Sequence, residues 1–318
     1  MLLWLRVAVG AILTVSFSVP LAILASDASL REEPMTLLVI NMTLVDLVFG
    51  VLFLATGLAD LVLAAGVPAP LCATLQYLLF GCAVAWKAAT LCLAVDQLAA
   101  VAQPLRYNAI MSSWTRRLVA LTWSCVPLMG LFGLVCYRLG LETSVEFDLR
   151  VLGVERHIAQ CRWEVNAHLF MVVAEAVLLL LSLSSGVLFV YAAVQGARHE
   201  WRLHPNNRLF LRFKSFQRIV KVLLVVATID VAAAGVRIGS RWSAHLGVTT
   251  LIQLLRVLCL IVEGWTYGLT QPAVRSTLAA FFGCRRGRVA DLSASELQRP
   301  TNPSSEWAER ALTESPRF

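Results

Sequence analysis

The chain has 318 residues, of which 58% are hydrophobic and only 15% are charged, and its mean hydropathy is +0.72. A soluble domain is about half apolar and about a quarter charged, so this composition excludes a water-soluble enzyme. The net charge of +7 comes almost wholly from arginine, since Lys87, Lys214 and Lys221 are the only lysines. In a membrane protein such a surplus marks the cytoplasmic face, and no nucleic-acid partner is expected.

Long apolar stretches follow one another along the chain. Crossing about 30 Å of hydrocarbon takes about 20 residues of helix, and each stretch is close to or above that length. No segment alternates polar and apolar residues at strand spacing, so helices are expected in lipid. The sequence predicts an all-α fold of seven transmembrane helices, at about Leu2–Ser26, Met35–Val62, Leu71–Ala102, Leu118–Cys136, Ala167–Val194, Ile219–Val236 and Val248–Leu269.

The basic residues of the connecting segments predict the orientation. One alternating set of segments carries fifteen Arg and Lys residues and the other set carries seven. Because positive loops stay in the cytoplasm, we expect a multi-pass plasma-membrane protein with its amino terminus outside and its carboxyl terminus inside. We expect the first span to be retained, since its apolar core exceeds the roughly 7 to 15 residues of a signal peptide.

The residues after the last span are of two kinds. Pro272–Phe282 has the pattern of a short amphipathic helix that lies in the inner membrane interface. Cys284 follows beside two arginines, where either a palmitoylated cysteine or an unmodified thiol is expected. The predicted division is a transmembrane domain with interfacial helix at 1–283 and a disordered, polar cytoplasmic tail at 284–318.

Several short motifs recur in a fixed order. The second span contains Asn41-Met42-Thr43-Leu44-Val45-Asp46, and the third begins at Cys72 and ends in Asp96-Gln97-Leu98, with Pro104-Leu105-Arg106-Tyr107 after it. Trp123, Tyr191 and Tyr267 follow in the fourth, fifth and seventh spans. In order and spacing, these motifs resemble those of rhodopsin-like (class A) G-protein-coupled receptors over nearly the whole chain. Pro34-Met35, Pro104–Tyr107 and Ile110-Met111-Ser112 are similar to odorant-type receptors, and a divergent orphan branch is the alternative.

The resemblance implies a function and a set of contacts. A small-molecule or peptide ligand would bind from outside, and a heterotrimeric G protein would bind inside, near Asp96, Gln97, Tyr191 and Tyr267. It also implies a disulfide between Cys72 and Cys161, for which Cys136 is a competing partner. No cofactor is implied.

Some positions depart from the family's pattern. Gln97 takes the place of the arginine that engages other helices and the G protein, and a neutral amide cannot make that charge-assisted interaction. The sixth span has Ala234 and Val236 where the family has tryptophan and proline, and the seventh has Glu263 in place of an asparagine. The usual switch is therefore not intact.

Ionisable residues inside the spans suggest what replaced that switch. Charges in the bilayer are costly unless they face the bundle and are paired. The resemblance implies that Lys87 and Asp230 take two places where an aliphatic residue and a phenylalanine pack together in the family, so we predict a buried ion pair between them. We also predict an approach of Glu263 to Asp46. Those two carboxylates would share a proton, bind a cation such as sodium, or use Lys87. The alternative is that the charges form a static structural network.

A second polar group is expected nearer the outside. Convergent polar side chains in an apolar cleft are the default hypothesis for a ligand site. Two arginines against one glutamate favour an anionic or zwitterionic ligand, although pairing of the glutamate with an arginine is an equal alternative. The predicted ligand-binding residues are Glu175, Arg237, Arg256, Gln76 and Gln253.

Other classes of membrane protein are less well supported. His199 and His204 are five residues apart, about 140° around a helix, which does not suit a metal site, and no enzymatic activity is expected. A transporter would explain the intramembrane charges, but no inverted repeat is visible. A receptor-like protein that pairs with another membrane protein without signalling remains open. The basic segment Arg198–Lys221 would contact solvent, membrane lipid or a transducer.

Overall fold

The computed structural model describes residues 2–26, 34–62, 69–103, 106–139, 149–151, 154–156, 168–200, 222–233, 235, 246–270 and 274–275. The chain divides into two compact units, Met1–Val274 and Arg275–Phe318, and the description below concerns the first. The predicted interfacial helix lies almost wholly outside the described residues. Cys284 and the predicted tail lie entirely outside them.

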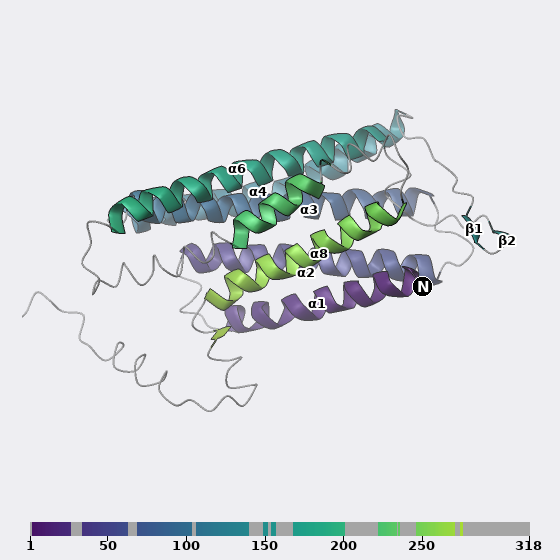
Figure 1. Ribbon diagram of the computed structural model, residues 1–318, viewed down its shortest axis with the longest axis horizontal. Coiled ribbons are helices and arrows are strands. Elements are labelled where there is room, and N and C mark those ends of the chain that lie inside the picture. Colours follow the sequence, from purple (N-terminus) through teal and green to yellow (C-terminus); the bar gives the residue numbers. More distant parts are fainter. Residues whose placement is uncertain are drawn as a thin grey trace, which may run out of the picture. The chain divides into compact units, whose positions relative to one another are not determined.

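Within the described residues the architecture consists of seven helices and one small hairpin (Figure 1). Five helices are long and apolar enough to cross a membrane: α1 (Leu2–Ser26), α2 (Pro34–Val62), α3 (Ala69–Ala102), α4 (Tyr107–Arg138) and α6 (His168–Glu200). The short apolar helix Val222–Ala233 and then α8 (Leu246–Thr270) follow. Each of the seven falls on one of the predicted stretches, so the all-α, seven-helix expectation is confirmed.

Two helices are longer than their apolar stretches. We expected the fourth span to begin at Leu118, but α4 begins at Tyr107, and α6 continues past the expected end at Val194 to Glu200. The added turns contain serine, arginine and histidine, which a helix accepts but the hydrocarbon does not. Hydropathy therefore finds the part of a helix that suits lipid and misses the turns beyond it.

A short antiparallel hairpin lies between α4 and α6, where no strand was expected. Strand β1 (Leu149–Val151) pairs with β2 (Val154–Arg156), with Val151 opposite Val154. Three residues are too few to produce a recognisable alternation of polar and apolar side chains. The hairpin lies between the predicted spans, so it does not affect the prediction of helices for them.

Helix α3 is the centre of the bundle. It packs against α2, α4 and α6, and most of its length is buried, whereas most of α4 faces outward. Aromatic rings hold three of these helices together: Phe170 of α6 meets Tyr77 and Phe80 of α3 edge-on, with ring centroids 4.9 and 5.5 Å apart, and also contacts Phe132 of α4. A polar side chain in the middle of α3 is consequently surrounded by other helices.

Helices α1 and α2 approach closely because each presents glycine to the other. A Cβ atom at Gly10 would lie 2.6 Å from the Cα atom of Leu54, and one at Gly50 would lie 3.1 Å from the Cβ atom of Leu13. Small residues are the common means by which helix backbones come together in lipid, where no hydrophobic force joins them. This contact positions α2, and with it Asp46, beside the rest of the bundle.

Candidate functional site: two groups of buried charges

Lys87 lies in the middle of α3 and forms the centre of the first group. Its Nζ atom is 2.5 Å from Oδ2 of Asp230, which lies on the helix Val222–Ala233. The two side chains are only 5% and 6% exposed. The predicted contact is therefore present, and it joins two helices that are far apart in the sequence.

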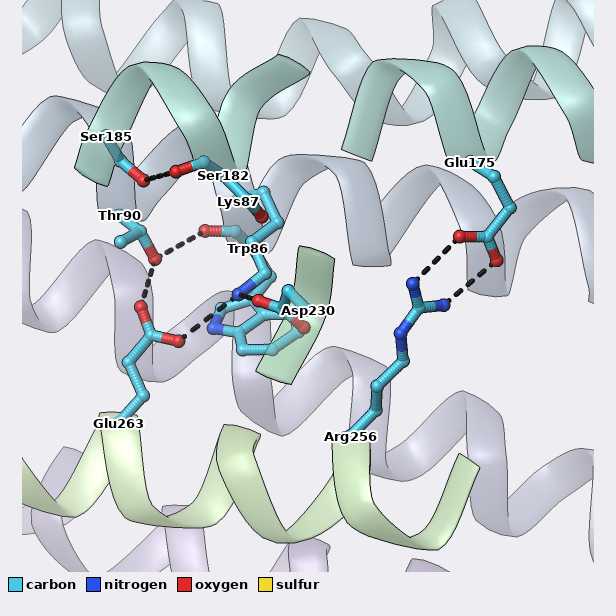
Figure 2. Close-up of polar contacts among 9 residues, drawn as sticks. All are labelled: Trp86, Lys87, Thr90, Glu175, Ser182, Ser185, Asp230, Arg256 and Glu263. Atoms are coloured by element: carbon cyan, nitrogen blue, oxygen red, sulfur yellow. Dashed lines mark hydrogen bonds and ion pairs between the residues drawn. The ribbon is translucent and has the colours of Figure 1, made fainter. Parts of the chain in front are cut away.

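Glu263 of α8 is the second carboxylate near Lys87. Its Oε2 atom is 3.4 Å from the Lys87 Nζ atom, and its Oε1 atom accepts a hydrogen bond of 2.5 Å from the Thr90 hydroxyl (Figure 2). Glu263 is completely buried. A buried charge needs an opposite charge and hydrogen bonds to its remaining lone pairs, and Glu263 has both. Lys87 thus joins α3, the helix Val222–Ala233 and α8.

Trp86 provides a further contact for the ammonium group. The Lys87 Nζ atom lies 3.6 Å from the centroid of the Trp86 ring, within the range of a cation–π interaction. The ring and the two carboxylates together surround the ammonium group (Figure 2). Sequence reasoning missed both Trp86 and Thr90. Thr90 could have been found, because it lies three residues after Lys87 and so on the same face of α3.

Asp46 of α2 is completely buried, but it does not pair with Glu263. Neither of its carboxylate oxygens has a hydrogen-bond partner among the residues that the structure describes. It lies against α8 at Gly264, where a Cβ atom would come within 3.0 Å of Asp46 Oδ2 and 2.5 Å of the Phe17 ring. Asp46 and Glu263 are therefore not hydrogen-bonded to each other, as a shared proton would require.

The same geometry bears on the predicted sodium ion. Sodium would need several oxygen ligands, but both oxygens of Glu263 already accept from Thr90 or contact Lys87. Of the two carboxylates, that of Asp46 is unengaged within the described residues. The described residues also contain no cluster of three His, Cys, Asp or Glu side chains suited to a metal. These residues therefore do not form a two-carboxylate cation site in this conformation.

The second group of charges is a bidentate pair. Arg256 of α8 donates through NH1 and NH2 to the two carboxylate oxygens of Glu175 in α6, at 2.9 and 2.8 Å (Figure 2). The side chains are 13% and 5% exposed. This is the intramolecular alternative to a ligand contact, and its two parallel hydrogen bonds are the strong form of such a pair. Arg256 precedes Glu263 by seven residues, about two turns, so both lie on one face of α8.

The other predicted ligand-site residues are placed less fully. Gln76 of α3 is 6% exposed, and its Nε2 atom lies 3.6 Å from the Cys72 sulfur. Arg237 and the side chain of Gln253 lie outside the described residues. The structure therefore brings Glu175 and Arg256 together and leaves the wider site a prediction.

The end of α3 is organised by short-range contacts. Tyr107, which begins α4, donates a hydrogen bond of 2.7 Å to Asp96, and Gln97 donates one of 3.4 Å to the same carboxylate. Gln97 also approaches the sulfur of Met35 at 3.8 Å. The Tyr191 side chain is 50% exposed, and that of Tyr267 lies outside the described residues. Within the described part of the chain, no hydrogen bond joins Gln97 to α6, to α8 or to the helix Val222–Ala233.

The cysteines are consistent with part of the expectation. Cys72 is disulfide-bonded, whereas Cys136 is a thiol, so the competing pairing with Cys136 is wrong. Cys161 lies outside the described residues, so its pairing with Cys72 stays a prediction.

Long apolar helices that bundle around paired charges are the architecture of an integral membrane protein. Asn41 and Trp123, two of the motif positions, meet through a hydrogen bond of 2.8 Å from the indole to the amide oxygen. The model of the rhodopsin family of seven-transmembrane receptors matches residues 18–235, more than half of the chain. The chain therefore belongs to the rhodopsin family of seven-transmembrane receptors, and it is a multi-pass membrane protein rather than an enzyme.

The matched part ends before α8, so Arg256 and Glu263 both lie beyond it. A comparison with curated proteins found no match.

Proposed function

We propose that the protein binds a small-molecule or peptide ligand in the outer half of the bundle and signals to a heterotrimeric G protein in the cytoplasm. Family membership supports receptor signalling in general. The observation that carries the proposal for this chain is the contact of Lys87 with carboxylates on two other helices. The excess of basic residues in alternate loops supports an external amino terminus in the plasma membrane.

The ligand would act on the pair Glu175–Arg256, with Gln76, Arg237 and Gln253 around it. The Nε atom of Arg256 is buried and has no hydrogen-bond partner within the described residues. A carboxylate or phosphate on the ligand would compete with Glu175 for the guanidinium group, because both present two acceptor oxygens to its fork of donors. An anionic or zwitterionic ligand therefore fits this position.

Helix α8 would carry the change inward. It holds Arg256 in the ligand group and Glu263 in the group around Lys87, about two turns apart on one rigid helix. A small shift or rotation of α8 would move Glu263 relative to Lys87. Lys87 also pairs with Asp230, so a change in the Lys87–Glu263 distance would alter the strength of the Lys87–Asp230 ion pair. That ion pair joins the helix Val222–Ala233 to α3.

The inner face would contact the G protein near Asp96, Gln97, Tyr191 and Tyr267. Gln97 can accept and donate neutral hydrogen bonds there but supplies no charge. A basic inner segment at Arg198–Lys221 would supply contacts to lipid or the transducer. The proposal further includes the Cys72–Cys161 disulfide, lipidation of Cys284 and an odorant-type or orphan branch of the family.

One observation favours a second candidate function. The short-range contacts of Gln97 would also suit a receptor-like protein that pairs with another membrane protein without activating a G protein. The two candidates differ in whether the chain activates any transducer.

The test is G-protein activation in cells, measured without ligand and across a ligand library, at controlled surface expression. The unmodified chain is compared with Gln97→Arg and with Gln103→Arg, which adds the same charge at an exposed position just after α3. Activation by the unmodified chain supports the proposal. A response only in Gln97→Arg means that coupling was lost at this position. Silence of all three at equal surface levels contradicts signalling and supports the partner protein.

A further inference from the structure

The buried charges around Lys87 do not balance. One ammonium group lies within reach of two carboxylates, Asp230 and Glu263, and Asp46 adds a third buried carboxylate nearby. The cation of the second group does not offset this excess, because Glu175 holds Arg256 through two hydrogen bonds. Among these buried groups of the described residues, the carboxylates therefore outnumber the cations, which makes any loss of Lys87 as a partner costly.

The two carboxylates bound to Lys87 are not equivalent. Asp230 is closer, at 2.5 Å against 3.4 Å for Glu263, but Glu263 also accepts from Thr90. Among the contacts described for the helix Val222–Ala233, the pair with Lys87 is its polar link to another helix. If this helix moves away from α3, Lys87 keeps Glu263, and Asp230 loses its partner.

No other cation within the described residues is free to replace Lys87 beside Asp230. On α8, Arg256 is engaged by Glu175, Cys259 is an uncharged buried thiol, and Glu263 is itself acidic. On α2, Asp46 is acidic, and on α6, Glu175 already serves Arg256 while Ser182 is uncharged. A bare carboxylate in hydrocarbon costs several kcal/mol, and addition of a proton removes that cost.

We infer that Asp230 is a proton-binding site, which takes up one proton when the helix Val222–Ala233 separates from α3. The Lys87–Asp230 ion pair breaks, a proton from water adds to the Asp230 carboxylate, and the ammonium group stays with Glu263. The inference rests on the proposed receptor function in one respect: that function is what connects the separation of the helix to signalling. A falling pH then favours the separated conformation, by up to about tenfold in its equilibrium constant for each pH unit.

The sign follows from the number of protons that each conformation binds. The packed conformation holds Asp230 as a carboxylate beside Lys87, whereas the separated one holds it as a neutral acid. Because the separated conformation binds the additional proton, acid shifts the population toward it. Asp46 lies against α8 at Gly264, so its protonation is not expected to differ between the two conformations.

The test uses the full chain in lipid nanodiscs, with genetically encoded spin labels at two exposed positions. Val225 reports on the helix Val222–Ala233, and Ser113 reports on α4. Distances between the labels are measured from about pH 8 to about pH 5, in parallel with G-protein activation by the unlabelled chain. The variants are Asp230→Asn, Asp230→Glu and, as the matched control, Asp46→Asn.

The population with separated labels should rise as the pH falls in the unmodified chain, in Asp230→Glu and in Asp46→Asn. Asp230→Asn should be separated to a similar extent at every pH, because an amide resembles the protonated acid. A label distance that does not respond to pH, or an unchanged response in Asp230→Asn, would overturn the inference. Movement with pH but no G-protein activation would instead contradict the proposed function while the proton site stands.

Discussion

Two regions of α3 differ in their polar contacts with the neighbouring helices. Around Lys87, in its middle, charged groups from α3, α8 and the helix Val222–Ala233 meet within 3.4 Å. Around Gln97, about 15 Å further along the helix axis, the contacts reach only Asp96, Met35 and, through Asp96, Tyr107. The resemblance to the family leads us to expect a charged link at the second place. In this chain the charged link lies in the middle of the bundle.

Of the substitutions considered, Lys87→Met should lower the free energy of unfolding the most. Removal of the ammonium group leaves Asp230 and Glu263 buried without their cation, and the loss of one partner from a buried ion pair typically costs about 3 to 5 kcal/mol. We expect a decrease of that size in the free energy of unfolding, measured by chemical denaturation in mixed micelles.

The matched control removes the acids as well. In Lys87→Met with Asp230→Asn and Glu263→Gln no buried charge is left in this group, so most of the lost stability should return. A triple variant as unstable as Lys87→Met would show that packing of the lysine side chain, rather than its charge, determines stability here.

The Glu175–Arg256 pair should show the next largest effect. Arg256→Ala removes two charge-assisted hydrogen bonds and leaves Glu175 with less compensation, at an expected cost of about 2 to 3 kcal/mol. Thermal unfolding in the same micelles measures it. The exchanged variant Glu175→Arg with Arg256→Glu should recover part of the lost stability. If Arg256→Ala is as stable as the unmodified chain, the pair is not formed.

Two glycines of α4 provide a smaller, purely steric test. A Cβ atom at Gly133 would overlap the Tyr77 ring of α3, whereas one at Gly130 would meet nothing within 4 Å. We expect Gly133→Ala to cost about 1 to 3 kcal/mol, as overpacking does. Gly130→Ala should leave the unfolding free energy unchanged or raise it by up to about 1 kcal/mol. Equal effects at both positions would contradict the α3–α4 contact.

The smallest effect on stability is expected at Gln97. Its hydrogen bond to Asp96 is long, and its contact with Met35 involves a weak sulfur acceptor. Gln97→Ala should change the free energy of unfolding by no more than about 0.5 kcal/mol. A loss as large as that of Lys87→Met would remove the distinction between the two regions of α3.

The sequence predicted the helices and the Lys87–Asp230 contact because both follow from the same constraint. Lipid demands continuous apolar helices, and it demands that a lysine in the middle of one find an acid on another. With few ionisable residues inside the spans, the number of candidate pairs is small. The resemblance to a family with known helix neighbours narrowed the choice to Asp230.

Other contacts could not be predicted because the competing arrangements differ in local geometry. Whether Glu263 turns toward Asp46 or Lys87 depends on side-chain rotamers. In the observed rotamer Glu263 contacts Lys87 and also accepts a hydrogen bond from the Thr90 hydroxyl. Whether Glu175 holds Arg256 or leaves it for a ligand depends on their separation across the bundle. The cation–π contact of Trp86 joins adjacent residues, and residue spacing along a helix gives no signal for it.

The proposed link between α3 and the helix Val222–Ala233 requires energetic coupling between Lys87 and Asp230. A double-mutant cycle with Lys87→Met, Asp230→Leu and the combined variant measures it, with the free energy of unfolding in micelles as the readout. We expect the combined variant to be more stable than the sum of the single changes implies, with a coupling of at least about 2 kcal/mol. Additivity within about 0.5 kcal/mol would show that the two residues do not interact, and would contradict the proposed link between α3 and the helix Val222–Ala233.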